Sequence, residues 1–204
     1  MCARAPSGSR DRGPTVTDDR RRFLKLVSVC LGYPDAALFA TLPEVATAAG
    51  SFGPAERGPV ADFADRLAAI PPLAAQEHWT SVFDLNPATS LNLTWHRLKD
   101  TENRARALAA LVDVYREAGF DPATEELPDY LPLVLEFLAQ IPPESEHPEP
   151  LADCLQALPE LAGRLKESGS IYAPLVALAA EIAEPAPASG VPRAPVAPAP
   201  GGYA

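Results

Sequence analysis

The sequence predicts an all-α protein: a single compact helical bundle over residues 18–183, with a disordered segment at each end. Between the ends, apolar residues recur at helical spacing, and no stretch alternates apolar and polar residues as a strand does. Apolar residues make up 47% of the 204 residues and charged residues 22%, as in average globular domains. Residues 1–17 are rich in Ser, Gly, Arg and Pro, and residues 184–204 in Pro and Ala. We therefore expect a disordered N-terminal arm and a disordered C-terminal tail.

The first helix is predicted to start near Asp18 or Asp19 and to present one apolar face to the core. That face carries Phe23, Leu26, Val27, Cys30 and Leu31. Residues 19–25 (DRRRFLK) also resemble the twin-arginine motif of export signals. Such a signal needs an apolar stretch of about 7 to 15 residues, whereas the stretch here, residues 26–31, stops at Gly32-Tyr33-Pro34. We therefore interpret the segment as a helix, and export of a reporter fused to residues 1–40 would contradict this.

Helices are predicted next at residues 35–49 and 60–70, and then at Pro72–Asp84, which has a proline in its first turn, where no N–H is needed. This helix is expected to bury Leu73, Gln76, Trp79, Val82 and Phe83. A helix over Thr89–Leu98 follows. Thr101–Ala118 has the clearest helical period, with Asp100 or Thr101 as its cap and Gly119 as its end. Its apolar face is formed by Leu108, Leu111, Val112 and Tyr115.

The segment Asp129–Ile141 is apolar on nearly every side, so we predict that it lies in the centre of the bundle. Asp129 is placed to act as its N-cap, which contributes about 1 kcal/mol. Two more helices complete the bundle. They are Pro150–Glu167, with a kink or restart at Pro159, and Ser170–Ala183, which carries Tyr172, Leu175, Val176, Ala179 and Ile182.

The overall charge restricts the class of partner. The formal net charge of −10 argues against a nucleic-acid partner, because nucleic-acid binders carry a dense basic face. An acidic surface instead suits a cationic segment of another protein. No apolar run approaches the roughly 20 residues of a membrane-spanning helix, so we expect no membrane insertion. The three cysteines are widely spaced without a CxxC pair, which predicts reduced thiols.

No catalytic, cofactor or metal constellation is recognisable in the sequence. The three histidines lie in separate segments, and zinc-protease, glycine-rich phosphate-loop and serine-hydrolase motifs are absent. Asp129 and Glu136 lie two turns apart, too far for a coupled acid and base. The residues alone favour a helix cap for the first and a surface or interface carboxylate for the second. We therefore predict a protein that is not an enzyme and that has no cofactor and no metal site.

Two polar-aromatic clusters remain, at residues 78–85 (HWTSVFDL) and 126–132 (ELPDYLP). Taken alone, Trp79 and Phe83 fit core positions, and Leu-Pro-Asp fits turn and capping chemistry. In this order and near this separation, the clusters resemble the signature of the NarJ branch of the TorD/DmsD/NarJ redox-enzyme maturation chaperones. The resemblance covers residues 23–183 and is most specific at 126–139 (ELPDYLPLVLEFLA). Trp79 stands where that family usually has tyrosine, and residues 100–106 lack its common Asp-Arg-Gly.

This resemblance implies a TorD-like fold and a role in assembling a respiratory nitrate reductase in the cytoplasm. The chaperone would bind the N-terminal peptide of the catalytic α subunit, and it would delay membrane docking while molybdenum cofactor is inserted. It would act as a monomer or a weak homodimer. We expect apolar residues to line a peptide groove and Asp84 and Asp129 to meet cations or peptide N–H groups. The expected peptide-binding residues are Trp79, Phe83, Asp84, Leu85, His96, Leu127, Pro128, Asp129, Tyr130 and Glu136.

Two other functions fit the same sequence. One is a helical adaptor or scaffold that joins folded subunits through its surface, and the other is a small helical hydrolase or ligand-binding enzyme. An adaptor would ignore the isolated N-terminal peptide of a nitrate reductase α subunit, whereas a chaperone would bind it. The enzyme is disfavoured because no nucleophile and base stand at a plausible spacing.

Overall fold

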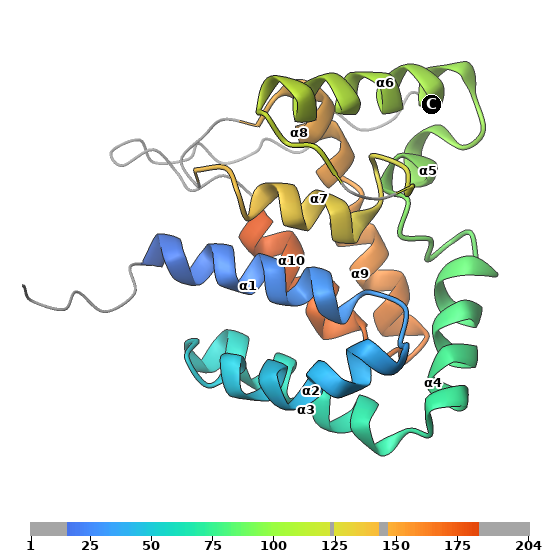
Figure 1. Cartoon of the computed structure of the whole chain (residues 1–204). Helices are drawn as coiled ribbons and strands as arrows, with labels where there is room; N and C mark the ends of the chain where they lie inside the picture. The colour runs from blue at the N-terminus through green and yellow to red at the C-terminus, as the bar shows by residue number, and fades with distance from the viewer. Residues whose placement is uncertain (1–15, 123–124, 143–146, 184–204) are drawn as a thin grey trace, which may run out of the picture.

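The computed structural model describes residues 16–122, 125–142 and 147–183, with side chains from residue 19 onward. These ranges contain no strand, and one isolated antiparallel bridge pairs Asn92 with Tyr130. The predicted all-α bundle is therefore confirmed (Figure 1). The predicted terminal segments lie outside the described residues, except for residues 16 and 17, which begin α1. In chain order the elements are α1 (Val16–Cys30), α2 (Ala36–Ala49), α3 (Pro54–Ala69), α4 (Pro72–Trp79), the π-helical turn η1 (Thr80–Asp84), α5 (Leu93–Leu98), α6 (Glu102–Glu117), α7 (Leu131–Leu138), α8 (Glu149–Leu155), α9 (Leu158–Glu167) and α10 (Ala173–Ala183).

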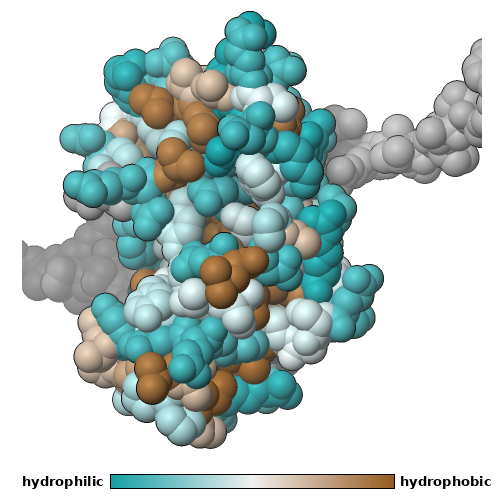
Figure 2. Space-filling view, turned by 90° about the vertical axis from the view of Figure 1, so that its right-hand side faces the viewer, coloured by the Kyte–Doolittle hydropathy of each residue, from teal (hydrophilic) through white to brown (hydrophobic). Residues whose placement is uncertain are grey.

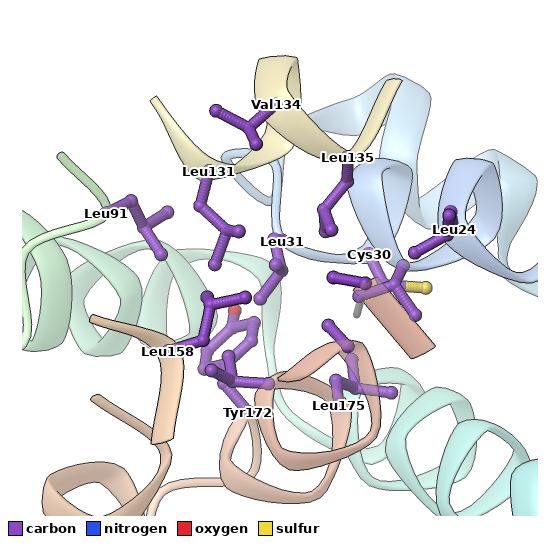
Figure 3. Packing of buried hydrophobic residues seen from close by; sticks show 14 of the residues in the cluster. Leu24, Cys30, Leu31, Leu91, Leu131, Val134, Leu135, Leu158, Tyr172 and Leu175 are labelled. Carbon is purple, nitrogen blue, oxygen red and sulfur yellow. The ribbon is translucent and has the colours of Figure 1, made fainter. Parts of the chain in front are cut away.

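Helix α7 lies at the centre of the bundle and packs against α1 and α10 (Figure 1). All of its residues except Glu136 are buried. Figure 3 shows Leu131 and Leu135 of this helix pointing into the core, toward Leu31, just after α1, and the layer that carries Tyr172 and Leu175. The central position predicted from the missing polar face is confirmed, because only an interior site satisfies a helix that is apolar all round.

The remaining helices form two groups on either side of this centre (Figure 1). In one group, α2 packs on α3, and α3 reaches α10. In the other group, α5 packs against α6 and α8, and α6 also packs against α8. Helix α9 runs beside α10.

The predicted helices are present with shifted boundaries. Helix α3 starts at Pro54 rather than at residue 60, because proline is favoured in a first turn. The predicted Pro72–Asp84 helix changes at Thr80 into η1, where the N–H of Leu85 donates to the carbonyl of Thr80 at 2.9 Å, the spacing of a π-turn. Helix α5 starts only at Leu93, because the preceding chain pairs with the segment before α7. The restart at Pro159 is confirmed by the break between α8 and α9.

Two predicted core positions are wrong. Leu73 is 68% exposed and Val112 is 40% exposed. Leu73 lies in the first turn of α4, ahead of Trp79, where the helix reaches the core. Helix α6 turns Tyr115 toward Phe137, with ring centroids 4.8 Å apart, and this orientation carries Val112 to the solvent side.

The Tyr172 side chain is fully buried, with its ring centroid 5.3 Å from that of Phe63 and 4.9 Å from that of Phe83. Its hydroxyl has no hydrogen-bond partner among the described residues. A buried unpaired polar group costs about 1–3 kcal/mol. We therefore expect Tyr172→Phe to raise the free energy of unfolding by about 1 kcal/mol, measured by urea denaturation.

Tyr115→Phe is the matched control for that variant. The Tyr115 hydroxyl donates to the carbonyl of Pro128 at 2.6 Å, so its removal should lower the free energy of unfolding by about 1 kcal/mol. A similar loss in both variants would show that the Tyr172 hydroxyl has a partner and that the expectation is wrong.

Candidate functional site

A buried polar cluster surrounds the carboxylate of Asp129, in the segment that leads into α7. Asp129 is 0% exposed. Its Oδ2 accepts hydrogen bonds from the backbone N–H of Thr94 at 3.0 Å and from the Thr94 hydroxyl at 2.5 Å, and its Oδ1 accepts one from the Asn92 amide at 3.2 Å. The guanidinium of Arg104 lies 3.7 Å from Oδ2 and also donates to the Thr94 hydroxyl at 3.1 Å. The carboxylate thus fastens the starts of α5 and α6 to the segment before α7.

The prediction that Asp129 caps the central helix is wrong. Helix α7 starts at Leu131, and no side chain caps its first turn. The carboxylate instead accepts the N–H of Thr94 in the first turn of α5, where helical N–H groups lack partners within the helix. A buried carboxylate is stable only when it is paired and hydrogen-bonded, and Arg104 with Thr94 supplies both conditions. Asp129 therefore holds the segment before α7 in place through its bonds to α5 and α6.

Trp79 and Phe83 also lie below the surface. Trp79 is 7% exposed and Phe83 is 3% exposed, so neither side chain lines an open groove in this structure, contrary to the prediction. The Trp79 indole N–H donates to the carbonyl of Leu31 at 3.0 Å, and its ring meets Phe83 and Tyr33 edge-on at 5.4 and 5.3 Å. The alternative interpretation of these aromatics as core residues is the one that the geometry supports.

Four predicted site residues reach the surface: Asp84, Leu85, Leu127 and Tyr130. Leu85, just after η1, is 75% exposed, and Leu127 is 42% exposed. Tyr130 is half-buried, and its burial, followed by the negative charges of Glu126 and Asp84, raises its pKa above the usual range. The negative charges of both carboxylates therefore act on its hydroxyl. We call this set of residues the acidic leucine surface: Asp84, Leu85, Glu126, Leu127 and Tyr130. Pro128, half-buried behind it, accepts the hydrogen bond from Tyr115.

Figure 2 views the molecule from the side that carries α4. Hydrophobic residues appear there as separate spots among hydrophilic ones, not as a continuous apolar trough. A partner bound on this side would therefore meet isolated apolar anchors separated by polar groups.

His96 is buried within α5 and holds neighbouring segments together. Its Nε2 lies 2.8 Å from the carbonyl of Ser90, and its Nδ1 lies 3.2 Å from the Arg164 guanidinium of α9. Because a guanidinium only donates, Nδ1 accepts and Nε2 carries the proton, so the ring is neutral. Burial lowers the pKa of His96 below 6.5, opposed by the hydrogen bond to Ser90 and reinforced by the charge of Arg164.

Glu136 lies in a different place from the other predicted site residues. It forms an ion pair with Lys25 of α1, and both side chains line an open groove of about 680 Å³ between α1, α2 and the end of α7. Sequence reasoning did not find this groove, because its lining comes from three helices and a turn that share no motif. The run of three arginines at residues 20–22 was the one sequence feature that pointed to this groove, since two of them line it.

The described ranges contain no group of three or more His, Cys, Asp or Glu side chains placed to hold a metal ion. No helix in them has the length and hydropathy needed to cross a membrane. Cys30 and Cys154 are buried and free. Burial raises the pKa of the Cys30 thiol to about 12, so this thiol stays protonated, which agrees with its predicted place on the apolar face of the first helix.

The described residues have the fold of a redox-enzyme maturation protein. A solved structure of this kind from Archaeoglobus fulgidus superposes with a TM-score of 0.61 at 21% identity, covering 86% of this chain and 98% of that one. This likeness defines the fold.

The chain itself belongs to the nitrate reductase delta subunit family, whose sequence profile matches residues 51–177. The nitrate reductase molybdenum cofactor assembly chaperone NarJ of Escherichia coli (strain K12) is 39% identical over 166 residues, which is 80% of this chain and 70% of that protein. The probable NarJ of Bacillus subtilis (strain 168), which has the same description, is 35% identical over 161 residues, or 78% and 87% of the two chains. The predicted resemblance is thus confirmed, and so is the prediction of a chaperone rather than an enzyme.

Proposed function

We propose that this chain is a cytoplasmic chaperone for a respiratory nitrate reductase. In this proposal it binds the N-terminal peptide of the catalytic α subunit, and it keeps the apoenzyme competent for molybdenum cofactor insertion before membrane docking. The observation that carries the proposal is family membership, because relatives that match most of the chain are named as molybdenum cofactor assembly chaperones of that enzyme. A monomer or a weak homodimer is sufficient for this role.

The acidic leucine surface is the binding site that we propose. An apolar side chain gains about 1.5–3 kcal/mol when it becomes fully buried, so the exposed Leu85 and Leu127 can anchor apolar residues of a peptide. Asp84 and Glu126 beside them favour a segment that also carries cations. Ordering such a peptide costs about 2–5 kcal/mol, so binding requires more than one anchor.

The buried predicted residues act in this proposal by keeping the surface in place. Asp129 fixes the segment that carries Leu127 and Tyr130, and Trp79 with Phe83 fixes η1, from which Asp84 and Leu85 project. A binding surface that is ordered in advance loses less conformational entropy on association.

Titration of the full chain with the fluorescently labelled N-terminal peptide of a nitrate reductase α subunit tests this proposal. We expect saturable binding that weakens as salt is added, because charge attraction between exposed groups is screened. Leu85→Asp should weaken binding about tenfold or more, since it removes an apolar anchor. Fluorescence anisotropy gives the dissociation constant in each case.

Leu73→Asp is the matched control, because Leu73 is a similarly exposed leucine at the start of α4, outside the acidic leucine surface. It should leave the dissociation constant unchanged. The proposal fails if the unsubstituted chain does not bind the peptide. An equal loss in both leucine variants would move the binding site elsewhere.

A further inference from the structure

The groove between α1, α2 and α7 has an apolar floor. Helices α1 and α2 meet near the turn that joins them and diverge beyond it (Figure 1), which leaves the space open. Its volume of about 680 Å³ lies within the range of about 300–1,000 Å³ for sites that hold a ligand. The floor is formed by Leu26 and Val29 of α1, Val45 and Ala48 of α2, Phe52 in the next turn and Ala139 after α7.

The charge along the groove is opposite in sign to that of the whole chain. The chain has 27 acidic and 17 basic residues, whereas the groove is bordered by Arg21, Arg22 and Lys25 against two carboxylates, Glu44 and Glu136. Lys25 pairs with Glu136. The Nε of Arg21 is buried and has no hydrogen-bond partner in the part of the chain that the structure describes. A carboxylate brought to this edge would supply the missing acceptor in a charge-assisted hydrogen bond.

We propose that this groove binds an acidic amphipathic segment of a partner protein. Arg21 and Lys25 are one helical turn apart, and Leu26 and Val29 continue the adjacent apolar stripe, so a cationic edge runs beside an apolar floor. A partner helix with an apolar stripe and carboxylates along one side matches both features. This site goes beyond the proposed function, because it is a second docking surface of opposite charge preference.

The shape of the groove favours a peptide over a flat anionic membrane. The space between its walls is about 680 Å³, and a flat bilayer surface would leave that space unfilled. A side chain that projects from a helix laid along α1 can enter it.

Two synthetic helices test the inference on the full chain by fluorescence anisotropy. One has a leucine stripe flanked by glutamates, and the other has lysines in place of the glutamates. We expect the glutamate helix to bind at least about tenfold more tightly than the lysine helix. The double variant R21E/R22E should lose about tenfold or more for the glutamate helix and gain affinity for the lysine helix. A misfolded variant would gain nothing, so the gain separates contact from damage to the fold.

R57E/R66E reverses the same number of charges on α3, outside the groove lining, and should change neither affinity. Equal binding of the two helices, or no saturable binding, would overturn the inference. Displacement of the glutamate helix by phosphatidylglycerol vesicles, or by self-association of the chain, would assign the groove to another occupant and overturn it as well. Leu85→Asp should not alter binding of the glutamate helix, so the outcome is independent of the proposed nitrate reductase site.

Discussion

Replacing Asp129 with alanine is expected to lower the free energy of unfolding by about 3–5 kcal/mol, because it breaks a buried ion pair from one side. The variant leaves the partly buried Arg104 without its counter-charge, and it leaves the Thr94 N–H and the Asn92 amide without their acceptor. A loss of this size is a large share of a typical total stability of about 5–15 kcal/mol. Urea denaturation followed by circular dichroism should show a lower midpoint with an unchanged slope.

A double-mutant cycle with Arg104→Met separates the pair from the hydrogen bonds. If Asp129 and Arg104 stabilise the fold as a pair, the double variant should lose less than the sum of the two single losses. Strictly additive losses would show that Arg104 does not stabilise the carboxylate and that the hydrogen bonds from Thr94 and Asn92 are sufficient.

The helices could be predicted from sequence because each buries a stripe set by local spacing. The segment LPLVLEFL has no polar face, so its place at the centre followed from composition alone. The helix boundaries were less predictable where backbone groups form hydrogen bonds with segments distant in the sequence. Thr89 donates its hydroxyl to the carbonyl of Val82, and Leu131 donates its N–H to the carbonyl of Leu91, and neither bond has a signal in the local sequence.

The candidate site could be predicted only in part. The two motifs predicted a common location, and the charge of Asp84 in one motif acts on the Tyr130 hydroxyl in the other. Helical spacing alone placed Phe83 among the buried positions, and it is buried. The burial of Asp129 depends on its contacts with Thr94 of α5 and Arg104 of α6, so it could not be read from spacing. The groove was missed for a similar reason: it results from the divergence of α1 and α2, which no residue pattern marks.

Replacing Trp79 with alanine is expected to lower the free energy of unfolding by about 3–5 kcal/mol, the usual cost of removing a buried tryptophan side chain. It removes the ring contacts with Phe83 and Tyr33 and leaves the carbonyl of Leu31 without its indole donor. Trp79→Phe keeps most of the ring but not the N–H, so its loss should be smaller, about 1–3 kcal/mol. Thermal and urea unfolding of both variants give these differences.

Comparison with Leu85→Ala then tests whether Trp79 supports the binding surface or contacts the peptide. Leu85 is exposed, so its truncation should change the free energy of unfolding by no more than about 0.5 kcal/mol while weakening peptide binding. Trp79→Phe should do the reverse, because a partly destabilised but still folded chain presents the same surface. If Trp79→Phe instead keeps its stability and loses peptide binding, the indole must reach the peptide, and the core would have to open in the complex.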